Sequence, residues 1–386
     1  MKKRIFIGII IGILVASLSF MIYYLANKGN TESGKNDKTT TVQTTNTDPG
    51  KITNNIKTVK ISAVGDILLG RGVGRRIVEQ NKTYSSAFEN VRGILKYGDV
   101  IFGNLEEPFT DSTKGLLDFD NGGKFVLKSE PKAMEAIVYG GFNLVSLANN
   151  HIIDYYTRGL YDTTKLLDKE GIAYAGAGKN IDEARKLSVI EKNGVKIGLL
   201  AYTEMAYLYY DGDPDIRFVA EKNSGGVAPY DVDFIKEDIK KARDSVDVLI
   251  VSLHFGIEYS LEPQQRQIDE THSFVDAGAD IIIGHHSHQD QGIEIYNGKP
   301  IFYSLGNFIF DQNDPISQRS FIINMELTNS KLSSLSAVPV QVMDKIRVVK
   351  VTGDLAKEMI ERERKLSVKL NSKCEFYNNT LKFNLN

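Results

Sequence analysis

The chain has a single cysteine and almost no net charge. Cys374 is the only cysteine among 386 residues, so an internal disulfide and a multi-cysteine zinc site are both excluded. The formal net charge is −2, which provides no strongly basic field to attract nucleic acid. The sequence also lacks a Gly-x-Ser-x-Gly nucleophile elbow. These absences argue against a disulfide scaffold, a nucleic-acid-binding protein and a serine hydrolase.

The N-terminal segment combines a basic start with a long apolar run. Lys2, Lys3 and Arg4 precede the predominantly apolar stretch 5–26. As a helix, this stretch would span roughly 30 Å, which is the thickness of the hydrocarbon core of a bilayer. The flanking cations predict residues 1–4 in the cytoplasm, a single-pass transmembrane anchor at 5–26 and the bulk of the chain outside the cell membrane. The alternative is a cleaved signal peptide, with Ala16-Ser17 as a weak cleavage site.

The remainder divides into a polar segment and a structured part. Residues 27–57 contain almost no large apolar residue and are predicted to be a flexible linker. From residue 58, short apolar runs alternate with amphipathic stretches, which predicts an α/β domain over 58–330. The turns at Asn193-Gly194 and Asn297-Gly298 indicate hairpins, so the sheets should be mixed. A C-terminal extension at 331–386, including a charged helix at 353–370, is expected to pack on this domain.

Several of the apolar strands end in side chains that can bind a metal ion. In open α/β sheets, ligands gather at the carboxyl ends of the strands, so these ends are expected to converge on one site. Imidazole, carboxylate and amide groups together suit a divalent transition metal such as zinc, manganese or iron. Such an ion would polarise a substrate oxygen and generate hydroxide near neutral pH. The strand-end residues are Asp66, Asn104, Glu106, Asn150, His151, His254 and the run His285-His286-Ser287-His288.

Each of these residues also has a structural interpretation. Asp66 could cap a following helix, and His254 could be a hydrogen-bonded core histidine. His285 is interpreted as structural, because adjacent residues of a strand point to opposite faces. Asn307 could support the site from a turn.

Six short motifs occur in the chain in this order: AVGD (63–66), GNLE (103–106), ANNH (148–151), SLHFG (252–256), IGHHSHQ (283–289) and YSLGNFIFDQ (303–312). This succession resembles the CapA family of poly-γ-glutamate capsule synthesis proteins, and the resemblance covers roughly residues 58–325. That family is similar to the calcineurin-like metallophosphatases, which implies a four-layer αββα sandwich with mixed sheets and a site for one or two divalent ions.

The resemblance also implies roles for individual residues. His151 matches the acid that protonates the leaving group, with Asp154 as its orienting partner, and Asn104 and Asn307 would lie behind the ligands. Leu68 departs from the pattern, because metallophosphatases have a histidine two residues after the first aspartate. Either a single ion binds, or Glu106 or Asn104 completes a second position. The implied metal ligands are Asp66, Glu106, Asn150, His254, His286 and His288.

The implied function is a membrane-anchored, extracytoplasmic role in the biosynthesis or export of a poly-γ-glutamate capsule, with metal-dependent hydrolase-like chemistry. The expected partners are poly-γ-glutamate or another anionic envelope polymer and membrane proteins of a capsule synthesis complex, but no nucleic acid. Two alternatives remain open at this point. One is a cell-surface metallophosphoesterase of another substrate, and the other is a non-catalytic polymer-binding scaffold.

Overall fold

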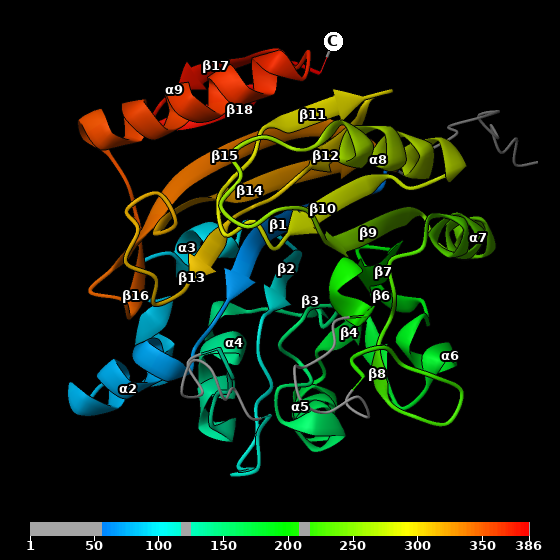
Figure 1. Cartoon of the computed structure of the whole chain (residues 1–386). Helices are drawn as coiled ribbons and strands as arrows, with labels where there is room; N and C mark the ends of the chain where they lie inside the picture. Colours follow the sequence, from blue (N-terminus) through cyan, green and yellow to red (C-terminus); the bar gives the residue numbers. More distant parts are fainter. Residues whose placement is uncertain (1–55, 117–124, 208–216, 386) are drawn as a thin grey trace, which may run out of the picture. The chain divides into compact units, whose positions relative to one another are not determined.

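The computed structural model describes residues 56–116, 125–207 and 217–385 (Figure 1). The predicted anchor at 5–26 and nearly all of the predicted linker lie outside the described residues. Among the helices in the described ranges, none combines the length and the apolar character needed to cross a bilayer.

The larger sheet has ten strands, eight of which follow the order β17-β18-β15-β14-β1-β2-β3-β4. In addition, β13 pairs with β1 and β16 pairs with β15. β1 pairs in parallel with β2 and β13 but antiparallel with β14, so the sheet is mixed. The strands are β1 (Thr58–Ile67), β2 (Val100–Leu105), β3 (Leu144–Ser146), β4 (Ala173–Ala175), β13 (Asn307–Ile309), β14 (Arg319–Thr328), β15 (Lys331–Met343), β16 (Arg347–Lys350), β17 (Cys374–Tyr377) and β18 (Thr380–Phe383).

The second sheet has six strands in the order β11-β12-β10-β9-β7-β6. Its centre is parallel, and the two expected hairpins form its edges. Asn193 and Asn297 both have positive φ and each precedes a glycine with positive φ, as the tightest hairpin turns require. The strands are β6 (Ser188–Lys192), β7 (Val195–Thr203), β9 (Val248–His254), β10 (Ile281–His285), β11 (Ile293–Tyr296) and β12 (Lys299–Phe302); a separate pair is formed by β5 (Ala177–Gly178) and β8 (Gly226–Val227).

Most of the helices cover the faces of the sheets that point away from each other, but the last one packs against the core between the sheets. The α-helices are α2 (Arg71–Glu79), α3 (Arg92–Leu95), α4 (Met134–Gly140), α5 (Tyr156–Glu170), α6 (Ile181–Ala184), α7 (Val232–Arg243), α8 (Gln265–Ala277) and α9 (Gly353–Lys369). The 3₁₀ turns are η1 (Tyr84–Ala87), η2 (Pro131–Ala133) and η3 (Glu204–Tyr207). In α7, for example, Asp231 caps the first turn and Ile235 and Ile239 are buried one turn apart.

The apolar core lies in three layers. One cluster fills the space between the two sheets and contains Ile61 and Phe102 from the larger sheet and Ile250 from the smaller one. A second lies between the larger sheet and helices α2–α5, and a third between the smaller sheet and helices α7 and α8. The prediction of an α/β domain with mixed sheets is confirmed. This packing fixes both sheets against each other and therefore fixes where their strand ends meet.

Candidate metal centre

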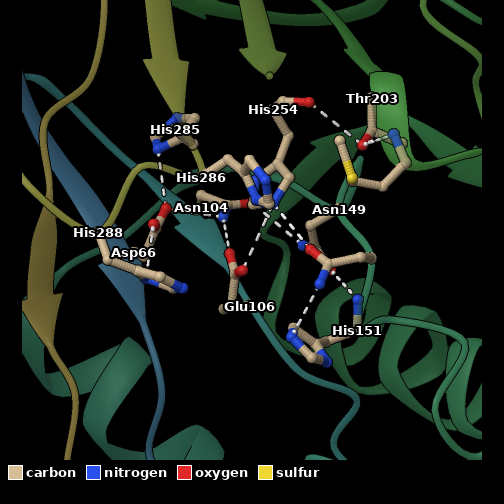
Figure 2. Close-up of polar contacts among 12 residues, drawn as sticks. Asp66, Asn104, Glu106, Asn149, His151, Thr203, His254, His285, His286 and His288 are labelled. Carbon is tan, nitrogen blue, oxygen red and sulfur yellow. Dashed lines mark hydrogen bonds and ion pairs between the residues drawn. The ribbon is translucent and has the colours of Figure 1, made fainter. Parts of the chain in front are cut away.

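The carboxyl ends of strands from both sheets meet at one place. Asp66 at the end of β1 is paired with Asn104 of β2 and with Asn307 of β13. In the smaller sheet, His254 at the end of β9 is paired with His285 at the end of β10. Figure 2 shows the side chains from the two sheets pointing toward one another. The packing of the two sheets therefore brings together residues that are far apart in the sequence.

Three of the converging residues form a group that could hold a metal ion. Asp66, Glu106 and His254 each offer one ligand atom, and these atoms all lie within 4.8 Å of one another. All three side chains are buried. Buried carboxylates without a cation nearby are costly, because the protein interior solvates charge poorly. The group therefore has the composition and the burial of a cation site.

Three potential ligand atoms surround Nε2 of His254. His254 Nε2 lies 2.8 Å from Asn150 Oδ1, 3.2 Å from His286 Nδ1 and 3.5 Å from Glu106 Oε1. With Glu106 ionised, the two oxygens can only accept, and a ring nitrogen carries at most one hydrogen, so hydrogen bonds cannot satisfy all these atoms. Glu106 Oε1 indeed has no hydrogen-bond partner among the described residues. A divalent ion coordinated by these four atoms would satisfy them, so the residues fit such an ion.

A second set of contacts surrounds Asp66. Its Oδ1 lies 3.0 Å from His285 Nδ1, and its Oδ2 lies 3.8 Å from His288 Nδ1. His288 Nδ1 is also 2.9 Å from Asn307 Oδ1. Asp66 Oδ2 has no hydrogen-bond partner within the described ranges. This carboxylate oxygen is therefore free to bind a cation between Asp66 and His288.

The loop after β10 has an unusual backbone. His286 and His288 have φ values of 92° and 58°, which side chains other than glycine rarely adopt. Each such residue costs roughly 1–3 kcal/mol and persists only where its surroundings hold it. Here the Tyr259 N–H donates to the Ser287 carbonyl at 2.7 Å, and Asp290 forms a bridge with Leu305. The bent loop turns both imidazoles toward the same site.

Two asparagines orient the carboxylates. Asn104 Nδ2 donates to Asp66 Oδ1 at 2.9 Å and also to Glu106 Oε2. Asn149 Nδ2 in turn donates to Asn104 Oδ1 at 3.1 Å and to the Leu105 carbonyl at 2.7 Å. Asn149 Oδ1 accepts from the N–H groups of His151 and Ile152. Asn149 thus connects the carboxylates to the turn that carries His151.

His151 lies at the edge of the site and is partly exposed. Its Nδ1 is 2.8 Å from Asp154 Oδ2, and its Nε2 is 2.9 Å from Asn150 Nδ2. Asp154 is buried and also accepts the Leu127 N–H at 2.6 Å. These contacts favour the tautomer in which Nδ1–H donates to Asp154 and Nε2 accepts from Asn150. Asn150 therefore bridges His151 and His254, with its amide nitrogen on one and its oxygen on the other.

The electrostatics of the site favour charge on Asp66. Burial opposes its ionisation, but the hydrogen bond from His285 and the neighbouring His288 outweigh burial, so the pKa of Asp66 lies below its usual value. Burial and the charge of Asp66 raise the pKa of Glu106 well above the normal range. Burial, followed by the nearby imidazoles, lowers the pKa of His254 far below its usual value. His254 is therefore neutral, as a metal-binding imidazole must be.

The structure places every residue of the implied ligand set, together with His151 and Asp154, at this convergence of strand ends. His285, which the sequence analysis interprets as structural, is fully buried, and its Nδ1 lies 3.0 Å from Asp66 Oδ1. Asn149 was not identified from the sequence, although its place in the Asn-Asn-His triplet was a signal. Glu107 was also missed. It is buried, it accepts hydrogen bonds from the N–H groups of Leu69 and Gly70, and burial raises its pKa to about 7.

A family model and two known proteins that match this chain are named for capsule synthesis or PGA biosynthesis. Residues 60–312 match the family model described as "Bacterial capsule synthesis protein PGA_cap". The chain is 33% identical over 303 residues to the "PGA biosynthesis protein CapA" of Bacillus subtilis, covering 78% of this chain and 76% of that protein. It is 32% identical over 332 residues to the "Capsule biosynthesis protein CapA" of Bacillus anthracis, covering 81% and 78%. A "Probable polyglutamine synthesis accessory protein" of Mycobacterium tuberculosis is 26% identical, with 72% and 83% covered.

Proposed function

The chain belongs to the PGA_cap family of bacterial capsule synthesis proteins, and on that premise we propose that it is a metal-dependent, hydrolase-like protein of poly-γ-glutamate capsule synthesis or export. The observation that carries the chemical part of this proposal is the buried group of Asp66, Glu106 and His254, whose ligand atoms lie within 4.8 Å of one another. The names of the relatives from Bacillus support the biological part.

The proposed ligands divide between the two sheets. Asp66, Glu106 and Asn150 lie at or just after the ends of strands of the larger sheet, and His254, His286 and His288 lie at or just after the ends of strands of the smaller one. Imidazole nitrogens in the set favour zinc, manganese or iron over calcium or magnesium. The six proposed ligands are enough to coordinate one or two ions. When bound, such an ion would polarise a substrate oxygen and lower the pKa of a coordinated water.

His151 is the proposed proton donor to the leaving group. Asp154 holds the ring through Nδ1, so Nε2 is directed away from Asp154 toward Asn150 and the ion site. A protonated Nε2 cannot keep the contact with the Asn150 amide, because both groups would then be donors. Protonated His151 therefore needs an acceptor, which the leaving group of a bound substrate would supply.

The proposed substrate is a polyanion of the cell envelope, with poly-γ-glutamate as the first choice. We place the catalytic part outside the membrane, held by an anchor at 5–26, next to membrane proteins of a capsule synthesis complex. One observation favours a second function, that of a non-catalytic polymer-binding scaffold. Leu68 stands where metallophosphatases have a metal-binding histidine, and its side chain is fully buried in an apolar cluster.

The decisive experiment measures metal content and turnover on the same protein. The full-length chain, purified in mild detergent, is analysed for bound metals and screened for hydrolysis of phosphoesters and γ-glutamyl polymers. A double variant, His286→Ala with His288→Ala, should lose the metal. The matched control is His272→Gln, because His272 contacts Glu294 rather than the site and its loss should leave the metal bound. Unchanged metal content in the double variant would refute the site, and bound metal without any turnover would favour the scaffold.

A further inference from the structure

Helix α9 lies outside the segment that matches the family model but packs against the loop that follows His288. The matched segment ends at residue 312, whereas α9 spans Gly353–Lys369. The helix contacts β11 of the smaller sheet and β15, β17 and β18 of the larger one (Figure 1). Its buried face is mostly apolar but includes Glu363, which is 1% exposed. A buried glutamate on an apolar helix face needs a partner, because carboxylates are almost never fully buried without one.

The partner is on the loop that carries His286 and His288. Asp290, two residues after His288, is buried and accepts a hydrogen bond from Arg362 of α9. Asp290 Oδ2 and Glu363 Oε2 are both buried without a hydrogen-bond partner among the described residues. A proton on Glu363, donated to Asp290, gives both oxygens a partner. Burial, followed by the charge of Asp290, raises the pKa of Glu363 well above its usual value, which agrees with such a shared proton.

The end of the same loop is fixed to α9 by a third residue. Ser367 Oγ accepts the Ile293 N–H at 3.0 Å and donates to Glu363 Oε1 at 2.9 Å. Gly292 lies directly against the helix backbone, because a Cβ at this position would be 2.8 Å from the Leu366 carbonyl. The loop is therefore attached to α9 through an ion pair, a hydrogen bond and a close backbone contact.

The loop needs such attachment because its backbone is strained. His286 and His288 both have positive φ, and this conformation persists only where neighbouring structure determines it. We infer that α9 positions the two imidazoles for metal binding, with Arg362 and Glu363 acting through Asp290 as positioning residues. This inference rests on the proposed metal site and assigns part of its affinity to a helix beyond the matched family segment.

The test measures zinc affinity of the full-length chain in mild detergent, by competition with a chromophoric chelator. Arg362→Ala should raise the Kd for zinc about 10- to 100-fold, the range found when groups that orient metal ligands are removed. Arg362→Lys should restore part of the affinity. Glu363→Gln should stay near wild type, since its amide still donates to Asp290. Arg364→Ala is the matched control, because Arg364 pairs with Glu361 on the same helix and not with the loop.

Two further measurements separate positioning from loss of fold. Far-UV circular dichroism checks that each variant is folded, and the absorption spectrum of bound cobalt(II), which reports ligand geometry, should change in Arg362→Ala. If that variant does not fold, Ser367→Ala tests the same attachment with a milder change and should weaken zinc binding a few-fold. An unchanged Kd and cobalt spectrum in folded Arg362→Ala and Ser367→Ala would overturn the inference alone. Absence of zinc binding by the wild-type chain would overturn the proposed metal site and the inference with it.

Discussion

If Asp290 and Glu363 share a proton, the free energy of unfolding should depend on pH in a way that can be measured. The pKa of Glu363 is raised by burial and by Asp290, so the folded protein keeps a proton that the unfolded chain releases above about pH 4.5. A group whose pKa is raised by folding stabilises the protein fully below its unfolded pKa. That stabilisation is lost as the pH rises toward the folded pKa. The perturbation that isolates the effect is Glu363→Gln, which has nearly the same shape and does not titrate.

The expected magnitude follows from counting one proton. While Glu363 stays protonated in the folded state, each pH unit lowers the free energy of unfolding by about 1.4 kcal/mol. Above about pH 5 the wild type should therefore lose stability relative to Glu363→Gln at this rate, and the loss should stop where the pH reaches the raised pKa of Glu363. Titrating groups that do not interact with Glu363 contribute equally to both proteins and cancel in the difference. The two curves of stability against pH should diverge steadily across this range.

The assay is urea unfolding of the metal-free, full-length chain at several pH values. Far-UV circular dichroism is the suitable signal, because the chain has no tryptophan. Glu361→Gln serves as the control, since Glu361 lies at the surface of the same helix in an ion pair with Arg364. Parallel curves for wild type and Glu363→Gln would show that Glu363 is ionised in the folded protein. In that case Asp290 and Glu363 would share no proton.

Three other predictions concern the active chemistry, the packing at the site and the topology. His151→Ala should lower turnover about 10²- to 10⁴-fold on substrates with poor leaving groups and less on good ones, with the metal still bound; equal losses on both would reject the acid role. Gly65→Ala should destabilise the fold by about 3 kcal/mol or more in urea unfolding, because the new Cβ would lie 1.8 Å from the Gly306 carbonyl, whose oxygen also accepts the Asp66 N–H. Protease added to intact protoplasts should remove the bulk of the chain, and full protection would contradict the proposed orientation.

The positions of the strand ends could be predicted from the sequence because two local signals coincide there. Apolar runs identify the buried strands, and the polar residues after them identify where each strand stops. Asp66 and His254 end such runs, and the structure ends β1 at Ile67 and β9 at His254. Parallel pairing then aligns these ends at one edge of each sheet. The meeting of the two edges depends on how the sheets pack, which no local pattern specifies.

The orientation of His285 could not be predicted, because the rule used for it ends with the strand. Neighbouring residues alternate between faces only while the backbone stays extended. β10 ends at His285, and the next residue, His286, already has a φ of 92°. Both rings can therefore face the same site. A similar limit applies to Glu363, since the contact between α9 and the loop joins Arg362 and Asp290 across 72 positions of sequence.

The chain lacks the histidine that the metallophosphatase pattern has two residues after the first aspartate, but another imidazole lies beside Asp66. Leu68 packs with Leu127 and Phe310 in an apolar cluster, so no ligand comes from that position. The Asp66 carboxylate nevertheless has an imidazole 3.0 Å from Oδ1, contributed by His285 at the end of a strand in the other sheet. His285 contacts the carboxylate itself, so it holds Asp66 in place, whereas the histidine of the usual motif would complete a metal shell. The motif around Asp66 alone therefore does not reveal that an imidazole lies beside this carboxylate. The placement of His285 depends on contact between the two sheets.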